Sequence, residues 1–172
     1  DDTEQALILA ARLIEGGGDI DERQLAKDFL AWEENVKARG LRDLLGPSTK
    51  LALDAILAGQ PLSETGKAGT TNGAAMRITP IGIATPIDHL EAFVDKVEMA
   101  CRMTHNTGEA IASAAAVAAV ISCGLNGHDF ASATKLALLA ADIGQKRGYQ
   151  VGETDMAQRI KIALSLAEGK PT

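Results

Sequence analysis

The sequence predicts an all-α fold, and three observations support this prediction. Apolar residues recur at spacings of three and four through most of the chain, as they do on the buried face of a helix. Glycine and proline interrupt this pattern where helices commonly end or begin. No stretch alternates apolar and polar residues for long enough to indicate a strand. Because the chain has 172 residues without an internal repeat or a long linker, we expect residues 1–172 to form a single all-α domain.

Three helices are predicted in the first third of the chain. They run through Ala6–Ile14, from about Asp21 to Arg39, and from Pro47 to Leu57. The first ends at Gly16–Gly18, because glycine readily adopts the left-handed backbone that closes a helix. A proline at the start of the third suits the first turn of a helix. The buried face of the second helix is expected to contain Leu25, Phe29, Trp32 and Val36.

The remaining chain predicts a loop and further helices. Gln60–Asn72 is rich in Gly, Ser and Thr and has no apolar period, which indicates a loop before the short apolar segment Ala74–Ile78. Another helix is expected after Pro86, and Thr107–Cys123 is apolar nearly all round, so we expect it at the centre of the bundle. In the helix expected after Pro86, the inward residues are Phe93, Val97, Ala100 and Cys101. Two more amphipathic helices are predicted over Phe130–Ile143 and Met156–Leu166.

Composition and charge argue against several classes of function. The net charge of -6 argues against a nucleic-acid partner, which needs a basic surface, and 3 % aromatic residues argue against a base-stacking platform. The opening Asp1-Asp2 does not fit a signal peptide, and the apolar run Ala110–Cys123 is too short to span a bilayer. We therefore expect a cytoplasmic protein with no membrane partner, in which Cys101 and Cys123 are reduced, buried thiols.

The opening segment Asp1-Asp2-Thr3-Glu4 has two competing interpretations. Asp and Thr are good N-caps, and acidic side chains favour a helix N-terminus through the dipole, so a plain helix start explains the segment. Adjacent carboxylates at a helix start also suit Mg²⁺, which prefers oxygen ligands. Taken alone, these residues favour the plain helix start.

The segment Gly69–Arg77 is the most distinctive in the chain. Two glycines bracket small polar residues immediately before a short predicted helix, and exposed N–H groups there suit a phosphate or a sugar hydroxyl. A flexible connection explains the same pattern equally well. Upstream, Gly59 and Gly66-Lys67 superficially suggest a P-loop. Six residues between the glycines, and Ala68 in place of Ser or Thr, exclude that motif.

His105 lies in Met103-Thr104-His105-Asn106, at the junction between two predicted helices. A lone histidine is more often structural or exposed, but a histidine flanked by Thr and Asn at a helix boundary is a candidate ligand contact. His89 and His128 have no comparable setting, and the three histidines lack zinc-binding spacing. The chain also lacks a G-x-S-x-G motif, so nucleophilic hydrolase chemistry is unsupported.

Four segments occur in an order that resembles the ADP-ribosylglycohydrolase family, which includes the dinitrogenase-reductase-activating glycohydrolase and the ADP-ribosyl-acceptor hydrolases. Asp1-Asp2-Thr3-Glu4-Gln5 is similar to the family's T-D-D-T motif without its leading Thr. Gly46-Pro47-Ser48-Thr49 resembles the stretch after the family's second helix. Asn72–Arg77, followed by Pro80-Ile81-Gly82, resembles the N-G-(A/G)-A-M-R…P-x-G segment. Thr104-His105, before an alanine-rich helix, resembles the T-H motif.

The resemblance implies a compact orthogonal helical bundle and a magnesium-dependent hydrolase. Such an enzyme cleaves the glycosidic bond between ADP-ribose and its acceptor, a protein side chain or a small molecule. Two Mg²⁺ ions are implied, which would orient the distal ribose and activate water, and Asp1 and Asp2 match their ligands. The residues that match substrate contacts are Asn72, Gly73, Met76 and His105.

Two motifs of the family have no counterpart in this sequence. The family has a glycine- and acid-containing segment before T-D-D-T and a D-x-D-T motif near its C-terminus, and its general acid or base belongs to one of these regions. Glu153-Thr154-Asp155 lacks the D-x-D-T order, and we interpret it as a helix N-cap. We therefore expect the central half to two-thirds of a family member, lacking its N- and C-terminal segments. Such a chain is expected to be weakly active or inactive by itself.

Two other functions stay open. A non-catalytic member would keep the helical scaffold as a structural or ADP-ribose-binding module, as the lens crystallins that resemble this family do. A generic helical interaction module is also compatible with the helical pattern, although four ordered motifs argue against it. The acceptor is left open between arginine, serine, an O-acetyl group and a nucleobase. Tyr149 is a candidate for stacking over the ligand.

Overall fold

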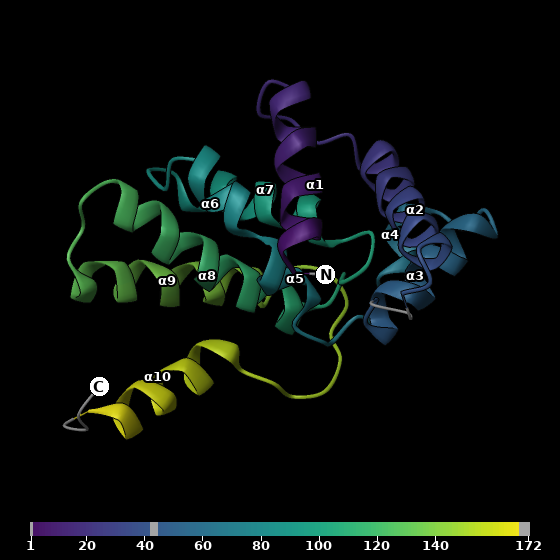
Figure 1. Ribbon diagram of the computed structural model, residues 1–172. Helices are drawn as coiled ribbons and strands as arrows, with labels where there is room; N and C mark the ends of the chain where they lie inside the picture. The colour runs from purple at the N-terminus through teal and green to yellow at the C-terminus, as the bar shows by residue number, and fades with distance from the viewer. Residues whose placement is uncertain (1, 42–44, 169–172) are drawn as a thin grey trace.

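The computed structural model describes residues 2–41 and 45–168, and in these ranges it contains ten helices and no strand (Figure 1). The helices are α1 Asp2–Glu15, α2 Glu22–Ala38, α3 Pro47–Leu57, α4 Leu62–Thr65, α5 Gly73–Arg77, α6 Thr79–Ala84, α7 Leu90–Cys101, α8 Gly108–Leu125, α9 Phe130–Gly144 and α10 Met156–Ala167. One isolated bridge joins Thr107 to Tyr149. The all-α prediction is therefore confirmed.

Helix α8 lies at the centre of the bundle, as its alanine-rich sequence predicts. It packs against α5, α6, α7 and α9, and Figure 1 shows α8 and α9 side by side. Small side chains permit this close approach: a Cβ added at Gly144 of α9 would lie 3.0 Å from the Ala112 backbone of α8. Most side chains of α8 are consequently buried among other helices.

The expectation that this apolar segment is too short to span a bilayer is wrong on length. Helix α8 extends beyond the apolar run Ala110–Cys123 to 18 residues, long and apolar enough to pass as a membrane span by length and composition. However, 61 % of it is buried inside the protein. Its packing, rather than its length, identifies it as a core helix.

Both cysteines are buried free thiols, as predicted. Burial raises the pKa of Cys101 to about 12, so this thiol stays protonated and unreactive at neutral pH. The four side chains predicted to face inward from α7 are all buried.

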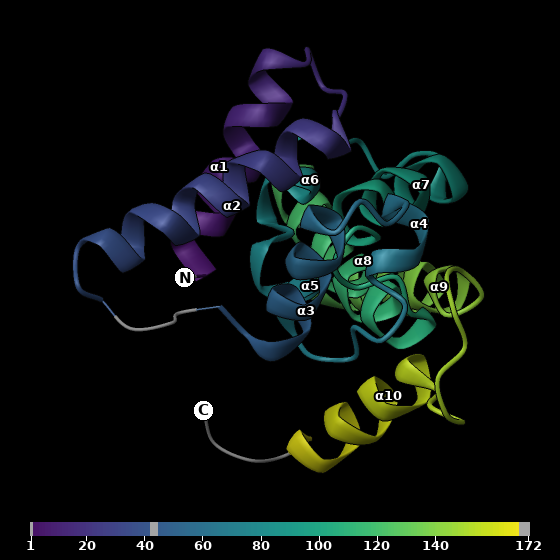
Figure 2. The ribbon, with the colours of Figure 1, turned by 90° about the vertical axis from the view of Figure 1, so that its right-hand side faces the viewer.

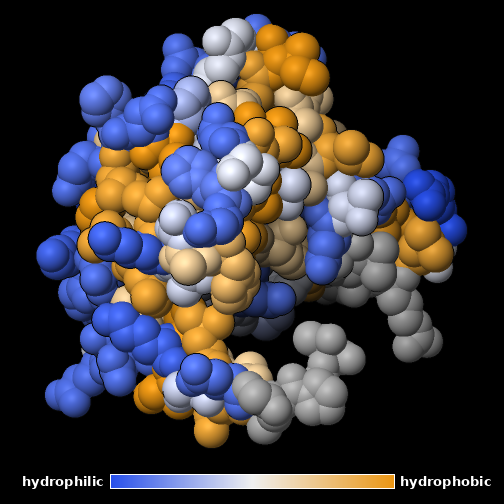
Figure 3. Space-filling view, turned by 90° about the vertical axis from the view of Figure 1, so that its left-hand side faces the viewer, coloured by the Kyte–Doolittle hydropathy of each residue, from blue (hydrophilic) through white to orange (hydrophobic). Residues whose placement is uncertain are grey.

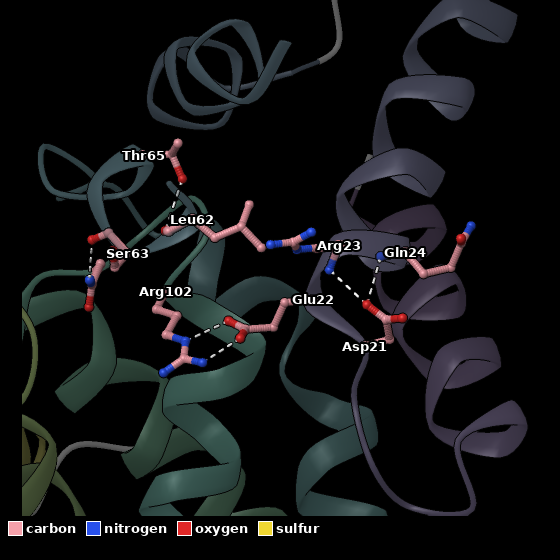
Figure 4. A network of polar contacts seen from close by, with 9 residues as sticks. Asp21, Glu22, Arg23, Gln24, Leu62, Ser63, Thr65 and Arg102 are labelled. Atoms are coloured by element: carbon pink, nitrogen blue, oxygen red, sulfur yellow. Dashed lines mark hydrogen bonds and ion pairs between the residues drawn. The ribbon is translucent and has the colours of Figure 1, made fainter. Parts of the chain in front are cut away.

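A glycine turn ends α1, and a side-chain cap marks the start of α2. Gly17 and Gly18 have φ angles of 60° and 99°, the left-handed backbone that ends α1. The Asp21 carboxylate accepts hydrogen bonds from the N–H groups of Arg23 and Gln24, which caps α2 (Figure 4). On the buried face of α2, Leu25, Phe29 and Val36 are buried as predicted, and Trp32 is half-buried.

An ion pair ties the start of α2 to the end of α7. The Arg102 guanidinium donates to both carboxylate oxygens of Glu22, with its Nε 2.6 Å from Oε1 (Figure 4). Two parallel bonds of this kind fix orientation as well as distance. Because Arg102 immediately precedes Met103-Thr104-His105, the pair anchors the segment that carries His105.

The predicted loop Gln60–Asn72 contains one helical turn, α4, which the sequence pattern did not indicate. Its four residues are too few to show a 3.6-residue period. The predicted apolar segment Ala74–Ile78 is helix α5, and it is followed directly by the separate helix α6. Pro80 stands in the first turn of α6, where a missing N–H costs nothing.

Helix α10 packs against α8 and α9 at the edge of the bundle (Figures 1 and 2). Ala157 is its only buried residue among those described. The predicted cap is confirmed, because the Asp155 carboxylate accepts from the Gln158 N–H at 2.9 Å.

Apolar side chains are exposed along one side of the molecule (Figure 3). A groove of about 360 Å³ between α1 and α6 is lined by Leu7, Ile14 and Ile83, among others, and these three side chains are exposed. A second groove of about 320 Å³ involves α8, α9 and α10 and includes Phe130. Among the residues that the structure describes, no charged side chain lines either groove.

Candidate functional site

Arg77, the last residue of α5, is fully buried and connects four parts of the bundle. Its guanidinium lies over the Phe29 ring, 5.1 Å from the centroid, and donates to Gln5 Oε1 of α1 at 3.3 Å. The same group donates to Thr104 Oγ1 at 2.6 Å and to the Ala100 carbonyl at 3.4 Å. Burial lowers the pKa of Arg77 to about 10, so the side chain still carries its charge at neutral pH.

His105 extends this network towards the surface. Its Nδ1 lies 2.9 Å from Thr104 Oγ1, and its Nε2 lies 2.9 Å from Thr71 Oγ1 in the exposed loop before α5. The ring is buried, and this burial, together with the charge of Arg77, lowers the pKa of His105 to about 3. At neutral pH the imidazole is therefore uncharged, with one nitrogen donating and the other accepting.

The glycines of the 66–73 loop allow it to lie directly on the His105 segment. A Cβ at Gly69 would lie 2.2 Å from the Thr104 carbonyl oxygen, and one at Gly73 would lie 2.6 Å from His105 Cε1. The Thr107 hydroxyl donates to the Gly69 carbonyl at 2.7 Å, which fastens the loop in place. The loop therefore packs closely against the core, which contradicts its interpretation as a flexible connection.

A small cavity opens beside this loop. Its volume is about 220 Å³, and it is lined by Asp2, Gly46, Pro47, Thr49, Thr71, Asn72, Gly73 and Met76. These residues come from the start of α1, the start of α3, and α5 together with the loop leading into it. Three segments that are distant in the sequence thus meet at one surface hollow.

A match to a family model covers residues 1–171, and its description is ADP-ribosylglycohydrolase. The chain belongs to the ADP-ribosylglycohydrolase family. It is 34 % identical over 166 residues to the uncharacterized protein YegU of Escherichia coli K12, with 96 % of this chain and 49 % of YegU covered. It is 32 % identical over 168 residues to an uncharacterized protein of Archaeoglobus fulgidus, with 98 % and 50 % covered. The chain thus spans about half the length of these relatives.

The structure brings together most of the ADP-ribosylglycohydrolase residues predicted from the sequence. Asp2, Asn72, Gly73 and Met76 all line the cavity. His105 does not line it, but reaches its edge through the Thr71 hydroxyl. Asp1 lies outside the described residues.

Sequence reasoning missed two hydroxyl residues and one buried cation. Thr49 and Thr71 line the cavity, although neither was singled out as a contact. The available signals were the position of Thr49 inside the family-like Gly46–Thr49 stretch and that of Thr71 inside the distinctive segment Gly69–Arg77. Arg77 ended the recognised N-G-A-A-M-R segment, but nothing in the sequence indicated that it points into the core and reaches Thr104.

Tyr149, the candidate stacking residue, lies away from the cavity lining. Its hydroxyl donates to Glu64 Oε1 at 2.6 Å, and its N–H donates to the Asn106 carbonyl at 2.8 Å. The hydrogen bond to Glu64 raises the pKa of Tyr149. These contacts hold the loop between α9 and α10 against the start of α8, which gives Tyr149 a structural role.

Oxygen donors of the kind that Mg²⁺ prefers gather at the cavity. They are the Asp2 carboxylate and the hydroxyls of Thr49 and Thr71. Mg²⁺ sites commonly use one or two carboxylates together with substrate oxygens and water, so this donor chemistry fits the ion. In residues 2–41 and 45–168, however, no group of three His, Cys, Asp or Glu side chains could hold a metal. Asp2 would therefore need ligands from elsewhere.

The depressed pKa of His105 makes part of the stability depend on pH. The folded protein keeps the imidazole neutral down to about pH 3, whereas the unfolded chain protonates it near 6.5. Between pH 3 and pH 6.5 the unfolded chain binds a proton at His105 that the folded protein does not bind. The stabilisation that comes from the neutral His105 is therefore complete above pH 6.5. It is lost as the pH falls towards 3, at up to about 1.4 kcal/mol per pH unit.

The variant His105→Gln tests this effect, since glutamine does not titrate. The difference in unfolding free energy between wild type and variant, measured by urea denaturation, is expected to shrink by about 2 kcal/mol from pH 7 to pH 5. The exposed His128→Gln is the matched control. A difference for His105→Gln that stays constant with pH would contradict the burial argument.

Proposed function

We propose that this chain contributes the substrate-facing part of a magnesium-dependent ADP-ribosylglycohydrolase site. The reaction is hydrolysis of the glycosidic bond between ADP-ribose and its acceptor. The observation that carries the proposal is the single cavity shared by Asp2 and the Thr71–Gly73 loop. A carboxylate for a cation and exposed polar groups for a sugar phosphate are the two chemistries that such a ligand needs.

Each residue has a distinct part in this proposal. The Asp2 carboxylate would hold Mg²⁺ together with ligands from outside the described residues. When bound, the ion supplies charge for orienting the ribose and activating water. The Asn72 amide and the Gly73 N–H face ribose and diphosphate oxygens, while the Met76 side chain gives apolar contact. Neutral His105 orients the Thr71 hydroxyl by a hydrogen bond from the core side, because its Nε2 lies 2.9 Å from Thr71 Oγ1.

The test is calorimetry of the protein that carries this chain, which is titrated with ADP-ribose first in Mg²⁺ and then in EDTA. Binding is expected in Mg²⁺ and is expected to weaken strongly in EDTA. Asp2→Asn should lower the affinity in Mg²⁺ at least about tenfold, because a hard cation loses a charged ligand. Asp142→Asn, an exposed change on α9, should leave it unaltered. Absence of any heat with ADP-ribose in Mg²⁺ would refute the proposal.

A non-catalytic ADP-ribose-binding module is the second candidate. It is favoured by the cavity lining, in which Asp2 is the only carboxylate among the residues described. Turnover separates the two candidates. Release of ADP-ribose from ADP-ribosyl-arginine, ADP-ribosyl-serine, O-acetyl-ADP-ribose or an ADP-ribosylated nucleobase indicates the enzyme, and binding without release from any of them indicates the module.

A further inference from the structure

The side chains from Arg77 to Thr71 form one chain of hydrogen bonds. Arg77 contacts Thr104, and Thr104 contacts His105. His105 in turn contacts Thr71. A hydroxyl can donate and accept, and each nitrogen of a neutral imidazole does one or the other, so these contacts permit two directions of donation. A guanidinium only donates, so Arg77 sets the direction at the buried end of the chain.

The Thr104 hydroxyl is fully buried and has one hydrogen to donate. Its Oγ1 must accept from Arg77 Nη2, which lies 2.6 Å away, because the guanidinium has no lone pair to offer. Two acceptors compete for the hydroxyl hydrogen: His105 Nδ1 at 2.9 Å and the Cys101 carbonyl at 3.5 Å. The former is an ordinary hydrogen-bond length, and the latter is longer than a hydroxyl donor normally makes. The Thr104 hydroxyl therefore donates to Nδ1.

The charge of Arg77 favours the same direction. The guanidinium is charged at neutral pH and interacts electrostatically with the His105 ring. An N–H at Nδ1 would turn its positive end towards this cation, whereas a lone pair at Nδ1 turns a negative end towards it. Inside a protein such interactions are stronger than in water, because the local dielectric constant is low. The cation therefore stabilises a ring whose Nδ1 carries no hydrogen.

We propose that the buried Arg77 holds His105 as the tautomer protonated at Nε2, and that Arg77 is thereby a positioning residue for the Thr71 hydroxyl. With its hydrogen on Nε2, the ring donates to Thr71 Oγ1 at 2.9 Å. The Thr71 hydroxyl accepts this bond and keeps its own hydrogen. That hydrogen has no acceptor in the part of the chain that the structure describes. The opposite tautomer would hold the Thr71 hydrogen on Nε2 instead.

The tautomer depends on the buried network alone, and it holds whether or not the proposed function is correct. Close packing keeps the ring in place, since a Cβ at Gly73 would lie 2.6 Å from His105 Cε1. The orientation of the ring follows from its partners, because a ring turned over would place carbon atoms against both hydroxyls. Only the use of the Thr71 hydroxyl rests on the proposed function, because a donor held at the surface matters where a ligand meets it.

The test is nitrogen NMR of the protein that carries this chain, with its histidine rings labelled with ¹⁵N, at neutral pH. In a neutral imidazole the protonated and the bare nitrogen have well-separated shifts, and couplings to the ring C–H hydrogens identify which is Nε2. The variant His105→Gln assigns the His105 signals by their loss. A protonated Nε2 and a bare Nδ1 are expected in the wild-type protein. A protonated Nδ1 would overturn the inference.

Variants at Arg77 test its part in selecting the tautomer. Arg77→Met removes the charge and the donor, so both tautomers should become populated and the two His105 nitrogen shifts should move towards each other. Arg77→Lys supplies a charged donor again and should return the shifts most of the way to wild type. Arg159→Met, an exposed change on α10, is the matched control and should leave them unaltered. Wild-type shifts in Arg77→Met, with its fold checked by circular dichroism, would disprove the role of Arg77.

Calorimetry with ADP-ribose in Mg²⁺ separates this inference from the proposed function. A protonated Nε2 in a wild-type protein that does not bind ADP-ribose would support the tautomer and refute the proposed function. A protonated Nδ1 in a protein that binds ADP-ribose would overturn the tautomer and leave the proposed function standing. Because the tautomer is measured in the wild-type protein, this result does not depend on whether Arg77→Met folds.

Discussion

Replacement of Arg77 by alanine is expected to lower the free energy of unfolding by about 3–5 kcal/mol. The fully buried side chain fills space over Phe29, so its removal leaves a void. It also leaves Gln5 Oε1 and Thr104 Oγ1 without their donor inside the core. Because α1, α2 and the end of α7 all meet at Arg77, these losses fall on the centre of the bundle. Urea denaturation at neutral pH measures the effect.

Two further variants define what is lost. Arg77→Met keeps much of the volume but supplies no hydrogen bonds, so it should fall between wild type and Arg77→Ala. Arg159→Ala lies on the exposed face of α10 and has no ion pair with any residue that the structure describes, so it should stay within about 0.5 kcal/mol of wild type. An Arg77→Met protein more stable than wild type would mean that desolvation of the guanidinium outweighs its hydrogen bonds, contrary to this prediction.

Gly73→Ala is expected to weaken ADP-ribose binding about a hundredfold or more and to cost about 1–3 kcal/mol of stability. The added Cβ would lie 2.6 Å from His105 Cε1 and 2.8 Å from its Nε2. The ring cannot turn aside easily, because Thr71 and Thr104 hold its two nitrogens. The loop must therefore move, and with it Thr71 and the cavity wall. Calorimetry with ADP-ribose and urea denaturation measure the two losses.

Gly124→Ala is the matched control for this change. Gly124 lies in the last turns of α8, and a Cβ there would meet nothing within 4 Å. The substitution should stabilise the protein by about 0.5–1 kcal/mol, because alanine loses less entropy in a helix, and it should leave ADP-ribose binding unchanged. The fit between Gly73 and His105 would be disproved by a Gly73→Ala protein as stable as wild type. The stability readout tests this fit even where ADP-ribose does not bind.

The prediction of the fold succeeded where the helices are long. The elements that became α1, α2, α3, α7, α9 and α10 carry their own apolar period, and α8 is apolar nearly all round. Local signals also mark helix ends and starts, such as Gly17–Gly18 after α1 and Asp155 before α10. The turn α4 and the break between α5 and α6 were missed, because four to six residues do not display a period. The exposed side chains of Leu7 and Ile14 were also not distinguishable from buried ones by their spacing.

The sequence by itself determined the helical class, the central position of the alanine-rich helix and the ordered motifs of an ADP-ribosylglycohydrolase. These properties are local, because they depend on residue type and on spacing within one segment. Only the tertiary structure decided that Asp2, Thr49 and the Thr71–Gly73 loop share one cavity. It also decided that Arg77 and His105 lie in one hydrogen-bonded network. Contacts between distant segments depend on how the helices pack, and helix packing has no signature within a single segment.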